Sequence, residues 1–204
     1  MKTKILPLLI ILPLIISSVK AQTKGQYMLG GNLSYFETGS GHTFAPDIEI
    51  GKFLKSNFVT GLMGGYAASK QANDSLAAHS FTIGAFIRQY YALGKRFNLF
   101  YELNASYQHY RNTWTYFYKE GTTFRSKSDG GMLNFIPGVS YSITNHLLGE
   151  LTLPNVASIS YNLYRPVVKP QGSDPKQHDF YFDANMNPSI LSNLAIGFRV
   201  LFGK

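Results

Sequence analysis

The 204-residue sequence predicts an all-β fold, an eight-stranded antiparallel up-and-down transmembrane β-barrel with short turns at one end and longer loops at the other. Three observations lead to this prediction. Bulky apolar residues alternate with small or polar ones, short and long connections alternate, and no run of 18 apolar residues follows the N-terminus. A chain that crosses a bilayer without such a run must form a closed barrel, in which backbone groups are paired internally.

The last segment, NLAIGFRVLFGK, shows the alternation most clearly. A period of two is a strand signal, and Arg199 lies on the face opposite the bulky residues. We therefore expect the bulky face to meet lipid and the Arg199 face to line a closed polar interior. The bulky residues are Leu194, Ile196, Phe198, Val200 and Phe202.

Seven further segments supply the other predicted strands, in order along the chain. The first is QYMLGGNLSYF, and in the second, FAPDIEIGKFL, apolar residues alternate with Asp47 and Glu49. The third, FVTGLMGGYAAS, is too rich in glycine for its faces to be assigned. In SFTIGAFIRQYYAL and FNLFYELNASYQHY the bulky residues oppose Arg88 and Glu102. MLNFIPGVSYSI is the sixth, and LLGELTLPNVASISYNLY, with Glu150, is read as one seventh strand.

The connections alternate in length, which sets the topology. The short ones are tight turns rich in turn-forming residues, at 55–57, 94–96 and 144–146. The long ones are residues 37–43, 70–79, 112–130 and 165 to about 191. Three short turns and four long loops are what an eight-stranded barrel with both termini at one end requires.

The direction of the two faces follows from side-chain size. A soluble barrel would place the apolar face inside, but eight strands leave little interior volume for bulky residues. Aromatic residues also gather near the predicted strand ends, as in the two aromatic girdles of outer-membrane barrels. These aromatic residues are Tyr27, Tyr35, Phe53, Phe58, Tyr90, Tyr91, Phe97, Tyr107, Tyr110, Tyr161 and Tyr164.

The N-terminus has the pattern of a cleaved secretory signal peptide, predicted as residues 1–21. A basic start and an apolar core, residues 5–16, precede a small-residue cleavage site that ends at Ala21. The core is too short to span a bilayer. Cleavage would leave one domain, residues 22–204, exported to the outer membrane of a Gram-negative bacterium.

Composition excludes several kinds of site. The chain has no cysteine, hence no disulfide, thiolate ligand, catalytic cysteine or lipidated cysteine. Its five histidines follow no metal-binding spacing and no phosphate-binding glycine motif is present, so we predict no metal and no cofactor. The formal net charge is +8. Many cations fall in the long links, either as ordinary solvated residues or as a surface that faces anionic lipopolysaccharide rather than nucleic acid. They are Lys70, Arg111, Lys119, Arg125, Lys127, Arg165, Lys169 and Lys176.

Several stretches resemble the small outer-membrane β-barrel family, often labelled porin-like. They are GKFLKSNFVTGLMGGYAAS, FIRQYYALGKRFNLFYELNASY and IPGVSYSITNHLLGELTL. The terminal LAIGFRVLF is similar to the barrel-assembly signal of such chains, although Gly203 and Lys204 follow the final Phe202. The resemblance covers nearly all of the mature chain. It implies outer-membrane lipid, lipopolysaccharide and the barrel-assembly machinery as partners, and says little about activity.

The predicted interior gathers six charged side chains: Asp47, Glu49, Arg88, Glu102, Glu150 and Arg199. Buried charges must be paired, so we expect a hydrogen-bonded ion network that fills the small lumen. Arginine at both cationic positions suits bidentate pairing and favours this structural interpretation. The alternative is a gated, narrow path through the barrel.

The two longest links are the candidates for contact with a protein or surface ligand. NTWTYFYKEGTTFRSKS reads as two strand extensions, and YNLYRPVV with DFYFDANM reads as a second pair. Either the pairs project beyond the membrane and bind a partner, or their aromatic residues pack in the interface zone. If the extensions spanned the bilayer, ten strands would result, but their charges disfavour lipid contact. The aromatic candidates are Trp114, Tyr116, Tyr118, Phe180 and Phe182.

Three functions stay open at this point. The leading one is a non-enzymatic structural or surface-interaction protein, and the second is a narrow channel for small solutes or ions. The third is a lipid A-modifying enzyme, because His42 with Asp74 and Ser75 resembles part of the lipid A palmitoyltransferase pattern.

Overall fold

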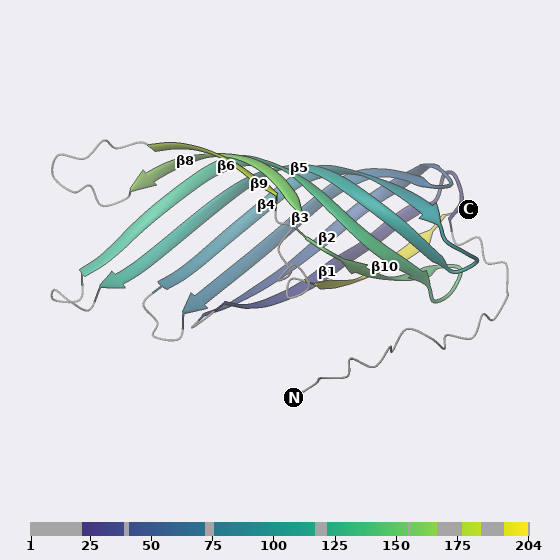
Figure 1. Ribbon diagram of the computed structural model, residues 1–204, viewed down its shortest axis with the longest axis horizontal. Helices are drawn as coiled ribbons and strands as arrows, with labels where there is room; N and C mark the ends of the chain where they lie inside the picture. The colour runs from purple at the N-terminus through teal and green to yellow at the C-terminus, as the bar shows by residue number, and fades with distance from the viewer. Residues whose placement is uncertain are drawn as a thin grey trace, which may run out of the picture.

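The computed structural model describes residues 22–38, 41–71, 76–116, 122–154, 156–166, 177–184 and 194–203. Its ten strands form one antiparallel sheet that closes into an elongated barrel (Figure 1). No described segment is a helix long and apolar enough to span a membrane. The predicted signal peptide, residues 1–21, lies outside the described residues.

The ten strands are numbered in chain order. They are β1 (Tyr27–Thr38), β2 (Gly41–Lys55), β3 (Phe58–Gln71), β4 (Leu76–Ala92), β5 (Phe97–Tyr116), β6 (Thr122–Ser142), β7 (Leu147–Thr152), β8 (Ala157–Pro166), β9 (Gln177–Ala184) and β10 (Ala195–Phe202). We call the end that carries the β2–β3, β4–β5 and β6–β7 turns the turn end, and the opposite end the loop end. The first and last described residues both lie at the turn end, where Tyr27 stacks on Phe202.

Eight of the strands form a closed ring. Successive hairpins join β1 to β7, β7 pairs with β10, and β10 returns to β1. The closing pairs run from Tyr27 opposite Phe202 to Leu33 opposite Ile196. The predicted eight-stranded antiparallel barrel is thereby confirmed.

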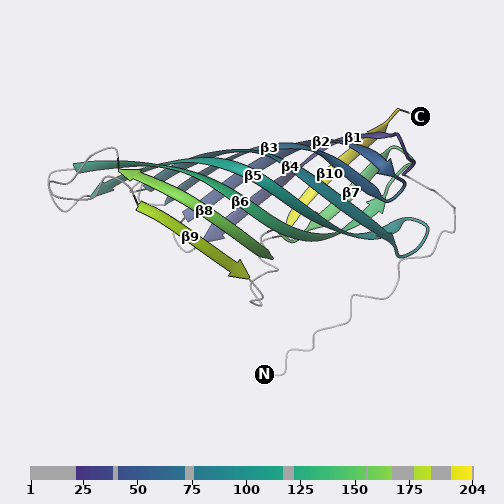
Figure 2. The same ribbon diagram turned by 90° about the horizontal axis from the view of Figure 1, so that it is seen from above.

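The predicted seventh strand is wrong as a single element. β7 pairs with residues 138–142 of β6, and β8 pairs with residues 126–135 of the same strand, so the two share one edge of β6. The chain leaves the ladder between them at Pro154, which has no N–H to donate. Beyond this break β8 pairs with β9 instead of β10, and the hairpin lies along the loop-end half of β6 (Figure 2).

Strand pairing extends further into the long links than the sequence suggested. Thr38 pairs with Gly41 and Lys70 pairs with Ala77, so the expected loops at 37–43 and 70–79 are mostly strand. Backbone N–H and C=O groups must find hydrogen-bond partners whatever side chains they carry, so the strands stay paired up to the residues of the turn. The expected strand pairs of the other two links are present, as β5–β6 reaches residues 116 and 122 and β8 pairs with β9.

The two faces of the barrel are as predicted, with bulky apolar residues outside. In β10, buried and exposed residues alternate without interruption from Ala195 to Phe202. Ile83 and Leu62 leave 66% and 63% of their surface exposed, whereas Arg88 and Arg199 leave 1% and 0%. An apolar outer wall around a polar interior matches a barrel whose solvent is lipid.

Candidate functional site

The interior network is centred on Arg88 of β4, whose guanidinium meets carboxylates from three other strands. Nη2 lies 2.7 Å from Oε2 of Glu49 and 2.5 Å from Oε2 of Glu102, and Nε donates to the same Glu102 oxygen at 3.0 Å. Nη1 lies 3.0 Å from Oε2 of Glu150. The three carboxylates come from β2, β5 and β7, so this one arginine links strands across the lumen.

Arg199 of β10 forms the second half of the network. Its Nη2 lies 3.1 Å from Glu49 and 3.4 Å from Glu150, and it also donates to Oδ1 of Asn32 at 3.0 Å. Nη1 donates to the carbonyl of Gly31 at 2.6 Å. Because Asn32 and Gly31 belong to β1, Arg199 reinforces the seam at which β10 closes the ring.

Asp47, the sixth predicted charge, lies at the margin of this network. Its Oδ1 accepts hydrogen bonds from the backbone N–H and the side-chain amide of Asn32, at 2.9 and 3.0 Å. The same amide approaches Glu49 at 3.4 Å. Asn32 therefore joins Asp47 to the central carboxylates through hydrogen bonds.

An apolar cluster packs around the network at the turn end, and the sequence did not predict it. Phe53 and Tyr90 were assigned to the aromatic girdle, but they are 1% and 2% exposed and stack on each other inside the barrel. Their positions are in phase with Glu49 and Arg88, so strand parity would have placed them inside. The cluster consists of Met28, Phe53, Val59, Phe86, Tyr90, Phe100, Leu148 and Leu201.

Tyr90 connects the cluster to the charges. Its hydroxyl lies 3.2 Å from Nη1 of Arg88 and 3.0 Å from Oε1 of Glu150. Phe86 and Phe100 also lie against the guanidinium of Arg88, whose Cζ is 5.5 and 4.8 Å from the two ring centroids. Cation–π contacts of this kind stabilise a desolvated arginine. Charge and aromatic packing together fill the turn-end half of the lumen.

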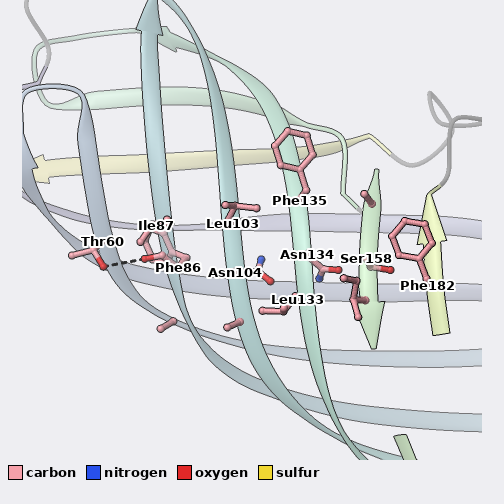
Figure 3. Close-up of a pocket in the computed structure, with 14 residues that line it drawn as sticks. Thr60, Phe86, Ile87, Leu103, Asn104, Leu133, Asn134, Phe135, Ser158 and Phe182 are labelled. Atoms are coloured by element: carbon pink, nitrogen blue, oxygen red, sulfur yellow. Dashed lines mark hydrogen bonds between the residues drawn. The ribbon is translucent and has the colours of Figure 1, made fainter. Parts of the chain in front are cut away.

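The outer wall carries an apolar groove of about 520 Å³, shown in Figure 3. Ala85 of β4 and Ala105 of β5 are small, and larger neighbours such as Leu103, Leu133 and Phe182 rise around them. A second hollow of about 350 Å³ shares Ala105 and Leu133 and continues past Gly131. We call the two together the outer groove.

Polar and basic side chains occupy the outer wall near the loop end. The Tyr107 hydroxyl donates to Asp129 at 2.5 Å, and Nδ1 of His109 lies 2.7 Å from the same carboxylate oxygen. Arg111 donates from Nε to Nε2 of His109 at 3.1 Å. Among the described residues, no group of three or more histidine, aspartate and glutamate side chains could hold a metal ion.

Comparisons with known proteins identify the fold. No family model matches the chain, and no curated protein matches it. Among solved structures, the outer membrane protein OprG from Pseudomonas aeruginosa is similar over 91% of this chain and 100% of its own, at 10% identity and a TM-score of 0.52. The chain has the fold of a small outer-membrane β-barrel.

Two further structures of the outer-membrane barrel fold are similar to the chain. Neisserial surface protein A covers 87% of this chain and 96% of its own, with 19% identity and a TM-score of 0.43. A major outer membrane protein from Thermus thermophilus covers 87% and 99%, with 10% identity and a TM-score of 0.48. At such identities the similarity shows the fold alone.

The aromatic residues predicted at the loops of this barrel are spread over different places. Trp114 and Tyr116 lie in the last residues of the β5–β6 ladder, and Tyr118 lies outside the described residues. Asp74 and Ser75, the residues that with His42 resemble the lipid A palmitoyltransferase pattern, also lie outside the described residues. Phe180 and Phe182 pair with Tyr161 and Ile159 on the outer wall, at the level of the outer groove. Of the two alternatives open for this hairpin, the position of Phe180 and Phe182 agrees with aromatic residues that lie at the barrel wall, and their contact with a partner stays a prediction.

The five residues of the predicted barrel-assembly signal all point outward. Leu194, Ile196, Phe198, Val200 and Phe202 are between 37% and 59% exposed. The predicted loop cations Lys70, Arg111, Lys127 and Arg165 are strand residues, because pairing continues past them. Sequence analysis did not predict that Arg111, Lys127 and Arg165 lie opposite one another, because the register between strands determines which cations become neighbours.

Proposed function

We propose that the chain is an integral outer-membrane protein with a closed lumen, which acts without catalysis at the cell surface. In this proposal residues 1–21 are removed on export, the turn end faces the periplasm and the loop end faces outward. The barrel-assembly machinery would recognise the alternating residues of β10. The binding capacity lies in the loop-end hairpins and the outer wall next to them.

The observation that carries the proposal is the position of Arg88. It is 1% exposed and contacts Glu49, Glu102 and Glu150 from three strands, while aromatic rings pack against it. A small solute would have to break several charge-assisted hydrogen bonds, each with a net contribution of about 1.5–3 kcal/mol. The interior of such a barrel stabilises the fold, and the outer surface is the part that can bind other molecules.

A narrow channel is the second candidate, and one observation favours it. Toward the loop end the buried interior residues are small and polar, as at Ser80, Ser106 and Ser126. A polar vestibule of this kind would conduct if the Arg88 network opened. Planar-bilayer recording of refolded residues 22–204 separates the two candidates, with the folded fraction verified by heat-dependent gel mobility. We expect no discrete currents, and reproducible single-channel openings would reject the closed-lumen proposal.

The orientation has its own test, because the natural chain contains no cysteine. We expect a membrane-impermeant maleimide to label Lys127→Cys on intact cells and to leave Lys95→Cys, in the β4–β5 turn, unlabelled until the outer membrane is broken. Equal labelling of both variants on intact cells, or labelling of Lys95→Cys alone, would contradict the surface role.

A further inference from the structure

Three basic residues stand side by side on the outer wall near the loop end. Arg111 of β5 is directly opposite Lys127 of β6, which is directly opposite Arg165 of β8. All three are exposed, and we call them the basic row. Side chains directly opposite each other in a sheet lie about 5 Å apart at Cβ, and like charges in such pairs destabilise the sheet. A bound anion would offset this repulsion.

The nearest carboxylate on the same wall is already engaged. Asp129 lies one position below the basic row, where it contacts both the Tyr107 hydroxyl and His109. Arg165 attracts Asp129 through its charge, and Arg111 donates from Nε to His109, but among the described residues no ion pair within 4 Å joins Asp129 to a cation of the basic row. One carboxylate beside three cations leaves the row with net positive charge for an external ligand, and the planar, many-donor head group of arginine matches phosphate geometry.

The height of the basic row places it at lipid headgroups. Outward-facing aromatic residues mark the apolar band on β5, from Phe97 at the turn end to Tyr107 toward the loop end. Ten residues of strand at the usual tilt of such barrels span about 25 Å, the height of the apolar band of an outer-membrane barrel. Arg111 lies four residues further, which adds about 10 Å along the barrel axis.

The outer groove lies on the same strands toward the turn end, separated from the row by the layer of His109 and Asp129. It crosses β5, β6 and the β8–β9 hairpin, and its floor is formed by small residues such as Ala105 and Gly131. Its volume of about 520 Å³ lies in the range of small-molecule sites. A ligand that fills both places must carry negative charge at one end and a hydrocarbon chain at the other.

We infer that this surface binds a phosphorylated, acylated glycolipid of the lipid A class, with phosphate on the basic row and one acyl chain in the outer groove. The inference rests on the proposed outward orientation of the loop end. Lipid A suits the row better than a phospholipid, because two phosphates can meet three adjacent cations. Bulk anionic phospholipid is the competing occupant, and the test distinguishes the two.

Native mass spectrometry of detergent-solubilised residues 22–204 with bisphosphorylated lipid A measures the binding directly. Arg111→Gln/Lys127→Gln/Arg165→Gln should bind lipid A at least about tenfold more weakly, since loss of one charged hydrogen bond already corresponds to about that factor. The matched control Lys52→Gln/Lys55→Gln/Lys95→Gln removes the same charge at the turn end and should bind as the natural chain does.

The groove has a separate variant, Gly131→Leu. A Cβ added at Gly131 meets nothing within 4 Å, so the barrel should fold with the groove filled. We expect weaker binding of lipid A and unchanged binding of the deacylated, bisphosphorylated disaccharide. Circular dichroism and heat-dependent gel mobility establish that each variant is folded.

Several outcomes would overturn the inference. One is a basic-row variant that binds lipid A as tightly as the natural chain does, and another is a turn-end control that loses as much lipid A affinity as the basic-row variant. The others are binding of phosphatidylglycerol as tight as that of lipid A, and displacement of lipid A by millimolar inorganic phosphate. The measurement does not depend on conductance. Channel openings with intact lipid A binding would reject the closed lumen alone, and a silent barrel without lipid A binding would reject this inference alone.

Discussion

Replacing Arg88 with methionine tests how far the interior network holds the barrel together. The change keeps an unbranched side chain but leaves Glu49, Glu102 and Glu150 facing one another, with Arg199 as their remaining cation. Removing one partner of a buried ion pair typically costs about 3–5 kcal/mol. With a urea dependence of about 2 kcal/mol per molar, the unfolding midpoint should fall by about 1.5–2.5 M.

The assay is urea unfolding of the refolded barrel in lipid vesicles, followed by the fluorescence of Trp114, the single tryptophan. Lys127→Met removes an exposed cation and should stay within about 0.5 kcal/mol of the natural chain. Arg88→Met combined with Glu102→Gln should lose less than the sum of the two single variants, because they share one interaction. An Arg88→Met midpoint equal to that of the natural chain would refute a structural role for the network.

Three further predictions address the seam, the lipid-facing wall and the packed interior. Arg199→Ala should lower the free energy of unfolding by about 3–5 kcal/mol, since it removes ion pairs and the donor to the Gly31 carbonyl, and an unchanged thermal midpoint would contradict this. Leu62→Arg, on the outer wall, should cost about 2–4 kcal/mol in vesicles, and a cost near zero would indicate that this face does not meet lipid. Gly138→Val should cost about 1–3 kcal/mol in urea unfolding, because an added Cβ would meet the Phe100 ring. Gly131→Ala should be close to neutral, because its Cβ meets nothing within 4 Å. Equal midpoints for the two variants would disprove the packing of Phe100 against Gly138.

The barrel could be predicted because its strongest signals are local. In β10 every second residue is bulky, and Arg199 falls among the intervening ones, so strand and face follow from eight consecutive residues. The interior positions of Arg88 and Glu102 follow in the same way from their parity on β4 and β5. Local periodicity needs no knowledge of neighbouring strands.

Pairing within the interior could not be predicted, because it depends on how the strands are staggered around the ring. Glu150 is 62 residues from Arg88 in sequence, and only the closure of β7 against β10 and β6 brings the two together. Stagger and strand tilt are properties of the closed barrel. The basic row has the same origin, since Arg111, Lys127 and Arg165 are ordinary strand cations until register aligns them.

Two predictions were wrong although the sequence contained a local signal for the correct answer, because a second signal was given more weight. Aromatic identity suggested the girdle for Phe53 and Tyr90, although both share the parity of interior charges. The apolar run through LLGELTLPNVASISYNLY suggested one strand, although Pro154 within it cannot continue a ladder. Parity and proline position should take precedence over residue class in chains of this kind.

The most direct test of the central claim is a spin-label scan along β10, which the absence of natural cysteine makes straightforward. Single cysteines at Ile196, Phe198 and Val200 on the outer face and at Ala195 and Leu201 on the inner face carry the label in refolded barrels in lipid vesicles. We expect collision with oxygen dissolved in lipid to alternate with period two and to be high at the first three positions only. Accessibility to oxygen that is equal on both faces, or high on the Arg199 face, would contradict a barrel whose bulky wall meets lipid around a filled polar interior.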